Sequence, residues 1–224
     1  MTFSLAGRCE RSGRFGIVIS SSSPAVAARC AHVRAGVGAA CTQNITDPRL
    51  GPALLGHLDR GLTSRSAMAR LVRDTGNIEY RQLTVIDALG DTAVHSGAHV
   101  LGLHASAQGT DAVAAGNLLA ADSVPAEMVL AFEAGTGNDL GDRLIAALQA
   151  GLAAGGEAGP VHSAGLLIAG EVEWAETDLR VDWSDDPIGQ LAALWRLWRP
   201  QAADYLRRAL APAEAPTYGV PGNE

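Results

Sequence analysis

Short stretches in which apolar and polar residues alternate, or in which β-branched residues dominate, recur along the chain and predict β-strands. The first two lie at the beginning of the chain and are separated by a glycine turn, which is typical of an antiparallel hairpin. The predicted strands are Thr2–Ala6, Phe15–Ser20, Ala35–Gln43, Tyr80–Asp87, Thr92–Ser96, Ser163–Ala169 and Leu179–Trp183. The segment His99–Asn117 contains several glycines and predicts only short strands and loops.

Other stretches place apolar residues three and four positions apart, which predicts helices. Capping residues and first-turn prolines mark several of their starts. The helices are expected after Asp47-Pro48, after Thr63 or Ser64, over Pro125–Phe132, from Asn138 or Asp139 to Leu152, and after Asp185-Asp186-Pro187. Hairpins outnumber strand–helix–strand crossovers in this order of elements. The pattern therefore predicts an α+β fold in which two antiparallel sheets carry helices on their outer faces.

Composition favours one large domain. The 224 residues are 47% hydrophobic and 18% charged, which provides ample material for a core and excludes a disordered or collagen-like chain. The sequence shows neither an internal repeat nor a linker. We therefore expect a single domain over residues 1–211, followed by a disordered proline-containing tail over residues 212–224.

The charges restrict the possible chemistry. The net charge of −7 argues against a nucleic-acid partner. All 17 basic residues are arginines, so the chain itself cannot supply a catalytic, Schiff-base or phosphate-loop lysine. The segment up to Arg81 holds 11 arginines and 5 acidic residues, whereas the rest holds 6 and 19. Either the two halves neutralise each other within the fold, or some arginines line a pocket for an anionic substrate.

The sequence also gives an expectation for the compartment. The three cysteines lack the spacing of a metal or redox motif and resemble buried side chains in a reducing environment. Arginines and a glutamate interrupt the beginning of the chain before an apolar signal segment can form, and no uninterrupted apolar stretch reaches the length of a membrane span. We expect a cytoplasmic protein without a membrane partner.

Thr2 is the first candidate for chemistry. Removal of Met1 would give this residue a free α-amino group beside its hydroxyl, so one residue could act as nucleophile and general base. The reference pKa of such an amine, about 7.7–8.0, suits a base at neutral pH. The alternatives are that Thr2 only begins the chain, or that a retained Met1 blocks the amine.

Polar residues at strand ends provide further candidates. Thr42-Gln43-Asn44 ends a small apolar strand, where amides often bind a substrate or an oxyanion. The alternative is that Asn44 and Asp47 only satisfy backbone groups at the turn. On the last predicted strand, Arg180 shares a face with Asp178 and Asp182. These three form either a structural ion pair or a group that orients a catalytic amine or binds a substrate carboxylate.

Cofactor sites are not indicated. The spacing of His95, His99 and His104 is similar to that of metal ligands, but glycines interrupt the segment, so the three do not share a helical face. Gly36 and Gly38 precede a strand pattern instead of a helix start, which excludes a dinucleotide fingerprint. We predict neither a metal site nor a cofactor.

An ordered series of motifs resembles the bacterial family known as domain of unknown function 1028. Individually the motifs are weak, but their order from residue 2 to about residue 200 is specific. They are Thr2-Phe3-Ser4-Leu5-Ala6-Gly7-Arg8, Arg34-Ala35-Gly36-Val37-Gly38-Ala39, Thr42-Gln43-Asn44 with Asp47-Pro48 and Gly51-Pro52, Val85-Ile86-Asp87, His95-Ser96-Gly97, Gly116-Asn117-Leu118-Leu119-Ala120 and Asp178-Leu179-Arg180-Val181-Asp182.

That family is regarded as similar to the N-terminal-nucleophile (Ntn) hydrolases, which implies a four-layer αββα sandwich. The resemblance implies that Thr2 is the nucleophile and base, and that Asn117 or Gln43 helps backbone N–H groups to hold an oxyanion. The residues that we expect to bind the substrate are Asn44, Arg34, Arg180, Asp182 and His95. Two departures stand out: the lysine of proteasome-type relatives is missing, and Ala115 stands where family members often have glutamine.

The leading functional interpretation is an amidohydrolase that cleaves a C–N bond in a small, anionic or carboxylated substrate. A catalytically silent metabolite-binding protein of the same fold, and a cyclohydrolase-like enzyme without an N-terminal nucleophile, stay open as alternatives. The last predicted helix carries Trp195 and Trp198, and its surplus apolar area also favours a homodimer.

Overall fold

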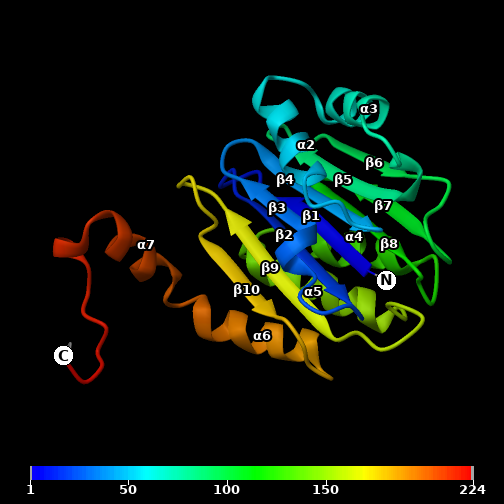
Figure 1. Cartoon of the computed structure of the whole chain (residues 1–224). Coiled ribbons are helices and arrows are strands. Elements are labelled where there is room, and N and C mark those ends of the chain that lie inside the picture. Colours follow the sequence, from blue (N-terminus) through cyan, green and yellow to red (C-terminus); the bar gives the residue numbers. More distant parts are fainter. Residues whose placement is uncertain (1, 223–224) are drawn as a thin grey trace.

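A computed structural model describes residues 2–222 (Figure 1). Within this range ten strands form two antiparallel sheets. The six-stranded sheet has the order β10-β9-β2-β1-β8-β7. Its strands are β1 (Thr2–Arg8), β2 (Phe15–Ser21), β7 (Ala105–Gly109), β8 (Ala112–Asn117), β9 (Ser163–Ala169) and β10 (Thr177–Val181).

The second sheet has the order β3-β4-β5-β6. Its strands are β3 (Ala31–Arg34), β4 (Gly38–Asn44), β5 (Arg81–Asp87) and β6 (Thr92–Ser96). The α-helices are α1 (Ala27–Cys30), α2 (Leu50–Asp59), α3 (Ser64–Asp74), α4 (Val124–Ala134), α5 (Leu140–Ala153), α6 (Pro187–Trp198) and α7 (Ala202–Leu210). Two short 3-10 helices cover Ile78–Tyr80 and Pro212–Glu214.

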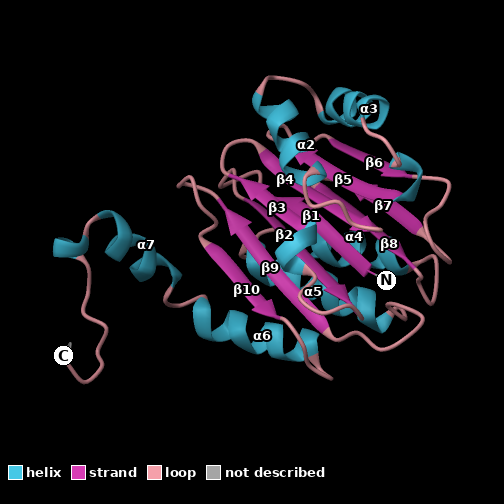
Figure 2. Cartoon of the chain, in the orientation of Figure 1, coloured by secondary structure: helices cyan, strands magenta, loops and turns pink. Residues whose placement is uncertain are grey.

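The elements stack in four layers, as the sequence predicts (Figure 2). Helices α4, α5 and α6 cover the outer face of the six-stranded sheet, and α2 and α3 cover the outer face of the four-stranded sheet. The inner faces of the two sheets pack on each other, because β1, β2 and β8 contact strands of the second sheet. The protein is therefore an αββα sandwich.

Three apolar layers hold the sandwich together. One fills the space between the six-stranded sheet and its helices, a second lies between the sheets, and a third lies under α2 and α3. Strand β1 shows how alternation assigns side chains to these layers. Phe3 and Leu5 belong to the helix-side layer, whereas Ala6 belongs to the inter-sheet layer. Both faces of β1 are thus covered, which makes it a central strand.

Most predicted elements are confirmed, and the differences have physical reasons. The segment His99–Asn117, predicted to form only short strands and loops, contains the hairpin of β7 and β8. The alanines and glycines of these strands give a weak hydrophobic signal. The last strand, predicted over Leu179–Trp183, is β10 and starts two residues earlier. Strand β3 and helix α7 were not predicted: β3 is only four residues long, and α7 buries none of its residues. No helix within residues 2–222 is long and apolar enough to cross a membrane.

The C-terminal segment returns along α7. The Arg208 guanidinium donates hydrogen bonds to the carbonyl oxygens of Pro216 and Thr217, and Tyr218 meets Tyr205 edge-on. The expected disorder of residues 212–224 stays a prediction, and residues 223–224 lie outside the described range.

The contact between α5 and α6 gives a stability prediction. The Trp195 indole donates to Asp142 at 2.8 Å and lies directly over Gly141, where a Cβ would overlap the ring. Helix propensity alone favours alanine over glycine by about 1 kcal/mol, but overpacking costs about 1–3 kcal/mol. We therefore expect Gly141→Ala to lower the melting temperature by about 2–6 °C in a thermal scan.

Gly56→Ala is the matched control, because Gly56 also lies inside a helix but the nearest atom to an added Cβ is 3.9 Å away. This variant should melt at or slightly above the wild-type temperature. An equal response of the two variants would contradict close packing at Gly141.

Candidate active site

Thr2 is the first described residue and begins the central strand β1. Its side chain is buried, with the residue 5% exposed, and Oγ1 donates to Ser21 Oγ on β2 at 3.4 Å. Across the other edge of β1, Thr2 lies opposite Asn117 of β8. Opposed residues in an antiparallel pair point to the same face, here the face toward the four-stranded sheet. Thr2 and Asn117 therefore lie side by side between the two sheets.

A buried glutamine from the second sheet joins this group. Gln43 on β4 accepts a hydrogen bond from Ser4 Oγ at 2.7 Å. Its Nε2 donates to Gln82 Oε1 at 2.8 Å and to the carbonyl oxygen of Ala115 at 3.2 Å. Gln43 is completely buried, so these bonds meet the requirement that buried polar groups be paired. Both hydrogens of its amide nitrogen are in use.

Gln82, its neighbour on β5, completes the set. Its Oε1 also accepts from Asn117 Nδ2 at 3.1 Å, while its Nε2 donates to Ser96 Oγ at 3.2 Å and to the carbonyl oxygen of Gly116 at 3.1 Å. The side chains of Ser4, Gln43, Gln82 and Asn117 thus form one amide network between the sheets. The sequence could have indicated Gln82, because it shares a strand face with the apolar Ile86.

The network gives Gln43 and Asn117 different capacities. Gln43 has no hydrogen left for an oxyanion, so it positions its neighbours. Asn117 donates only one of its two amide hydrogens, and its buried Oδ1 has no partner among residues 2–222. Because an unpaired buried polar atom is costly, Asn117 is the network member with unused hydrogen-bonding capacity.

Sequence reasoning missed Glu157. Its carboxylate oxygens accept the backbone N–H of Ser22 at 3.1 and 3.2 Å, directly after the Ser21 that contacts Thr2. The residue is 4% exposed, and burial raises the pKa of its carboxyl despite the hydrogen bonds from Ser22, which favour the charged form. Glu157 is the only charged residue between Arg143 and His162, which was the available signal.

Asn44 lies next to Gln43 in the sequence but holds a loop. Its Nδ2 donates to the carbonyl oxygen of Tyr80 at 2.6 Å, and its Oδ1 accepts from Leu101 N–H at 3.1 Å. Its φ of 71° is in the left-handed region that asparagine tolerates. These contacts fit the alternative in which Asn44 satisfies backbone groups. The role of Asn44 in substrate binding stays a prediction.

The structure does not bring the other predicted binding residues to Thr2. Arg34 pairs with Gly38, at the opposite end of β4 from Gln43, and contacts Asp59 at 3.3 Å. Arg180 on the edge strand β10 is held by two hydrogen bonds to Asp178, at 2.5 and 2.7 Å. The Asp182 side chain is exposed, and its carbonyl oxygen accepts the Ala25 N–H. The His95 ring lies 3.3 Å from the carbonyl oxygen of Ile78.

The histidine segment does not form a metal centre among the residues that the structure describes, where no group of three potential ligands occurs. His99 packs against the Tyr80 ring, with the centroids 4.8 Å apart. His104 is exposed, and its Nδ1 lies 3.3 Å from the carbonyl oxygen of Gly102.

The layers and the buried polar site define the class: an αββα sandwich whose central strand starts with Thr2 beside an inter-sheet amide network. Residues 2–191 match the family of unknown function DUF1028, and the chain belongs to this family. The resemblance found in the sequence is confirmed. No match exists among curated proteins.

Two solved structures are similar. The crystal structure of protein SPO2555 from Silicibacter pomeroyi, of the same family, has a TM-score of 0.85 and 28% identity, with 92% of this chain and 90% of that chain covered. Anbu (ancestral beta-subunit) from Yersinia bercovieri has a TM-score of 0.44 and 11% identity, with 97% and 100% covered, a level that supports no further inference.

Glu157 leads to a pH-dependent prediction. The pKa of its carboxyl in the folded protein is raised above the reference value of 4.5, so folding favours the protonated form. Its stabilising contribution is present below pH 4.5 and is lost as the pH rises through the folded-state pKa. In a pH series of melting temperatures, Glu157→Gln should therefore gain stability relative to wild type as the pH rises.

Glu127→Gln provides the control, since Glu127 is an exposed residue of α4. Its difference from wild type should not follow the same pH course. A difference between Glu157→Gln and wild type that stays constant across the series would contradict the raised pKa.

Proposed function

We propose that this protein is an amidohydrolase that cleaves a C–N bond in a small molecule, with Thr2 as nucleophile and base. The observation that carries the proposal is the position of Thr2: it begins the central strand of an αββα sandwich with its side chain beside Asn117. A nucleophile needs a base and an oxyanion donor within reach. With Met1 removed, Thr2 would contain both the nucleophilic hydroxyl and the basic amine, and Asn117 can supply the oxyanion donor.

The proposed reaction begins with the removal of Met1, which turns the Thr2 peptide nitrogen into an amine. The amine accepts the proton of Oγ1 while Oγ1 bonds to the substrate carbonyl carbon. The unused amide hydrogen of Asn117, together with backbone N–H groups, stabilises the oxyanion. The C–N bond then breaks as the ammonium returns its proton to the leaving nitrogen. Water hydrolyses the resulting ester of Thr2 and regenerates the hydroxyl.

Gln43 and Gln82 support this mechanism indirectly. They fill the space behind Asn117 with saturated hydrogen bonds, so the Asn117 amide has a fixed orientation. Ser21 lies on the other side of Thr2, and Glu157 fixes the backbone at Ser22. Fixed orientation of the oxyanion donor is the condition under which such a donor stabilises a transition state most.

Substrate charge is a separate question. The guanidinium groups of Arg34 and Arg180 are engaged by Asp59 and Asp178. At about 3.3 Å per residue, Arg34 lies about 17 Å along the strand direction from Gln43. We therefore base the mechanism on none of the predicted binding residues, and an anionic substrate stays a prediction.

The test combines mass and turnover. Intact-mass measurement of the protein from its native host should show loss of Met1. A panel of small amides, assayed by release of ammonia or amine, should then identify turnover that Thr2→Ala abolishes and Thr2→Ser retains in part. Melting temperatures of both variants should stay within about 2 °C of wild type, because each loses or changes few atoms.

Thr75→Ala, far away at the end of α3, is the control and should keep wild-type turnover. Uniform retention of Met1 would exclude the free-amine mechanism. Full turnover in Thr2→Ala would indicate the cyclohydrolase-like alternative, and a stabilising metabolite that is never converted would indicate a binding protein.

We also propose a cytoplasmic homodimer. The cysteines Cys9, Cys30 and Cys41 are free thiols, as expected in a reducing compartment. Helices α6 and α7 expose Leu197 and Leu210, which are 65% and 60% exposed. Light scattering on the eluting protein should give twice the chain mass, and Leu197→Glu should reduce it; a monomeric mass for wild type would refute the dimer.

A further inference from the structure

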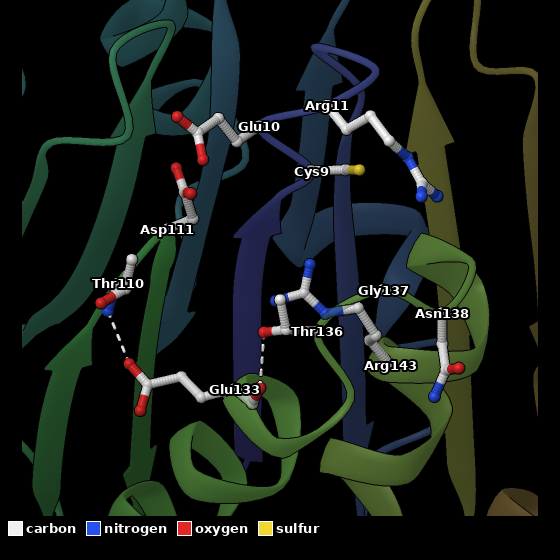
Figure 3. Close-up of a pocket in the computed structure, with 10 residues that line it drawn as sticks. All are labelled: Cys9, Glu10, Arg11, Thr110, Asp111, Glu133, Thr136, Gly137, Asn138 and Arg143. Atoms are coloured by element: carbon white, nitrogen blue, oxygen red, sulfur yellow. Dashed lines mark hydrogen bonds between the residues drawn. The ribbon is translucent and has the colours of Figure 1, made fainter.

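A cavity of about 540 Å³ lies at the end of β1 opposite Thr2 (Figure 3). The turn after β1, the turn between β7 and β8, and the segment joining α4 to α5 surround it. We call it the Arg143 cavity, and the residues that line it are Cys9, Glu10, Arg11, Thr110, Asp111, Glu133, Thr136, Gly137, Asn138 and Arg143. Along β1 it is about 20 Å from Thr2, so it is separate from the proposed reaction.

Arg143 is the unusual member of this lining. The residue is only 8% exposed, and its guanidinium lies over the Phe132 ring, 3.8 Å from the centroid. Its Nε donates to the Phe132 carbonyl oxygen at 3.1 Å. Neither terminal nitrogen is hydrogen-bonded to any of residues 2–222, and no ion pair within that range includes Arg143.

The terminal nitrogens of Arg143 open onto the cavity and have no hydrogen-bond acceptor among residues 2–222, so they can bind an anion. Burial lowers the pKa of the Arg143 guanidinium despite the opposing effects of Cys9, Asp111 and Glu133. The planar guanidinium fork matches the two oxygens of a carboxylate. The cavity thus offers one half of an ion pair.

The opposite charge gathers on the other side of the cavity. Figure 3 shows Glu10, Asp111 and Glu133 on one side, whereas Arg143 points into the middle and Arg11 lies on the far side. Asp111 is already paired with Arg8 at 2.7 Å. Among residues 2–222, the Glu133 carboxylate accepts one hydrogen bond, from the Thr110 N–H to Oε1 at 2.7 Å. Its second oxygen therefore remains for a cationic group.

We propose that the Arg143 cavity binds a small zwitterion of the amino-acid type, with its carboxylate on Arg143 and its ammonium group on Glu133. The neighbouring carboxylates disfavour a plain anion such as phosphate, because like charges repel. A free carboxylate and a free ammonium group on one ligand satisfy both sides of the cavity at once. The volume leaves room for a side chain in addition to these two groups.

Cys9 provides a built-in reporter. Burial raises the pKa of its thiol, but hydrogen bonds from Ser12 and Arg11 and the positive charge of Arg143 outweigh this effect, and the net pKa is lowered. Burial raises the pKa of Cys30, and it raises that of Cys41 to about 12. Because the thiolate is the reactive form, iodoacetamide should modify Cys9 first. A ligand in the Arg143 cavity should shield this thiol.

The experiment titrates the full-length protein with single L-amino acids and follows both the melting temperature and the rate of Cys9 alkylation, read by peptide mass spectrometry. At least one amino acid should raise the melting temperature and slow alkylation. Its carboxamide and inorganic phosphate should do neither. Arg143→Gln should weaken binding about ten- to a hundredfold, as expected for loss of a charged hydrogen bond.

Two further variants keep the test decisive if Arg143→Gln fails to fold. Glu133→Gln should weaken binding of the amino acid. It should leave unchanged any weak binding of the corresponding acid that lacks the amino group. Arg70→Gln, an exposed control on α3, should bind like wild type. The proposal is overturned if no amino acid binds, if phosphate protects Cys9 equally well, if Glu133→Gln has no effect, or if binding leaves Cys9 unprotected.

Discussion

The relative position of the two sheets depends on the amide network between them. Hydrophobic packing holds the inner faces together, but it is non-directional and tolerates sliding. Gln43 and Gln82 remove that freedom, because each reaches from the four-stranded sheet to backbone carbonyl oxygens of β8. A shift of one residue would leave several buried amide groups unpaired, at about 1–3 kcal/mol each. The network therefore fixes which residues of the two sheets face each other.

This constraint divides the inter-sheet space into two halves. Around Ala6 and Phe15 the space is apolar, whereas near the start of β1 it contains hydroxyl and amide groups. A reactive site needs preorganised polar groups, and an apolar core cannot provide them. The polar half contains such groups, with Thr2 and Asn117 buried beside the amide network. The stability of the sandwich and the orientation of the candidate site thus have one cause.

The sequence predicts the layers well, because alternation and helical spacing report which face of each element is buried. It misses α7, although this helix has a clear helical spacing of apolar residues, and the strand β3, which is too short to show a period. For the site, the family resemblance selects Thr2, Asn117 and Gln43, but only the strand register brings them together. Glu157 has only its isolated position in an apolar stretch as a sequence signal, and Arg143 escapes prediction because burial and the lack of an ion-pair partner are not revealed by a linear pattern.

The absence of lysine limits which groups could act as a base near Thr2. In this sandwich no lysine can adjust the basicity of a nucleophile, and arginine holds its proton too firmly to exchange it. The described residues around Thr2 contribute the Ser21 hydroxyl and the Asn117 amide, and Glu157 accepts the backbone N–H of Ser22, the residue after Ser21. Burial raises the pKa of the Glu157 carboxyl, and both of its oxygens accept the Ser22 N–H. In the proposed mechanism the α-amino group of Thr2 accepts the proton of Oγ1, and removal of Met1 is the step that would expose this amine.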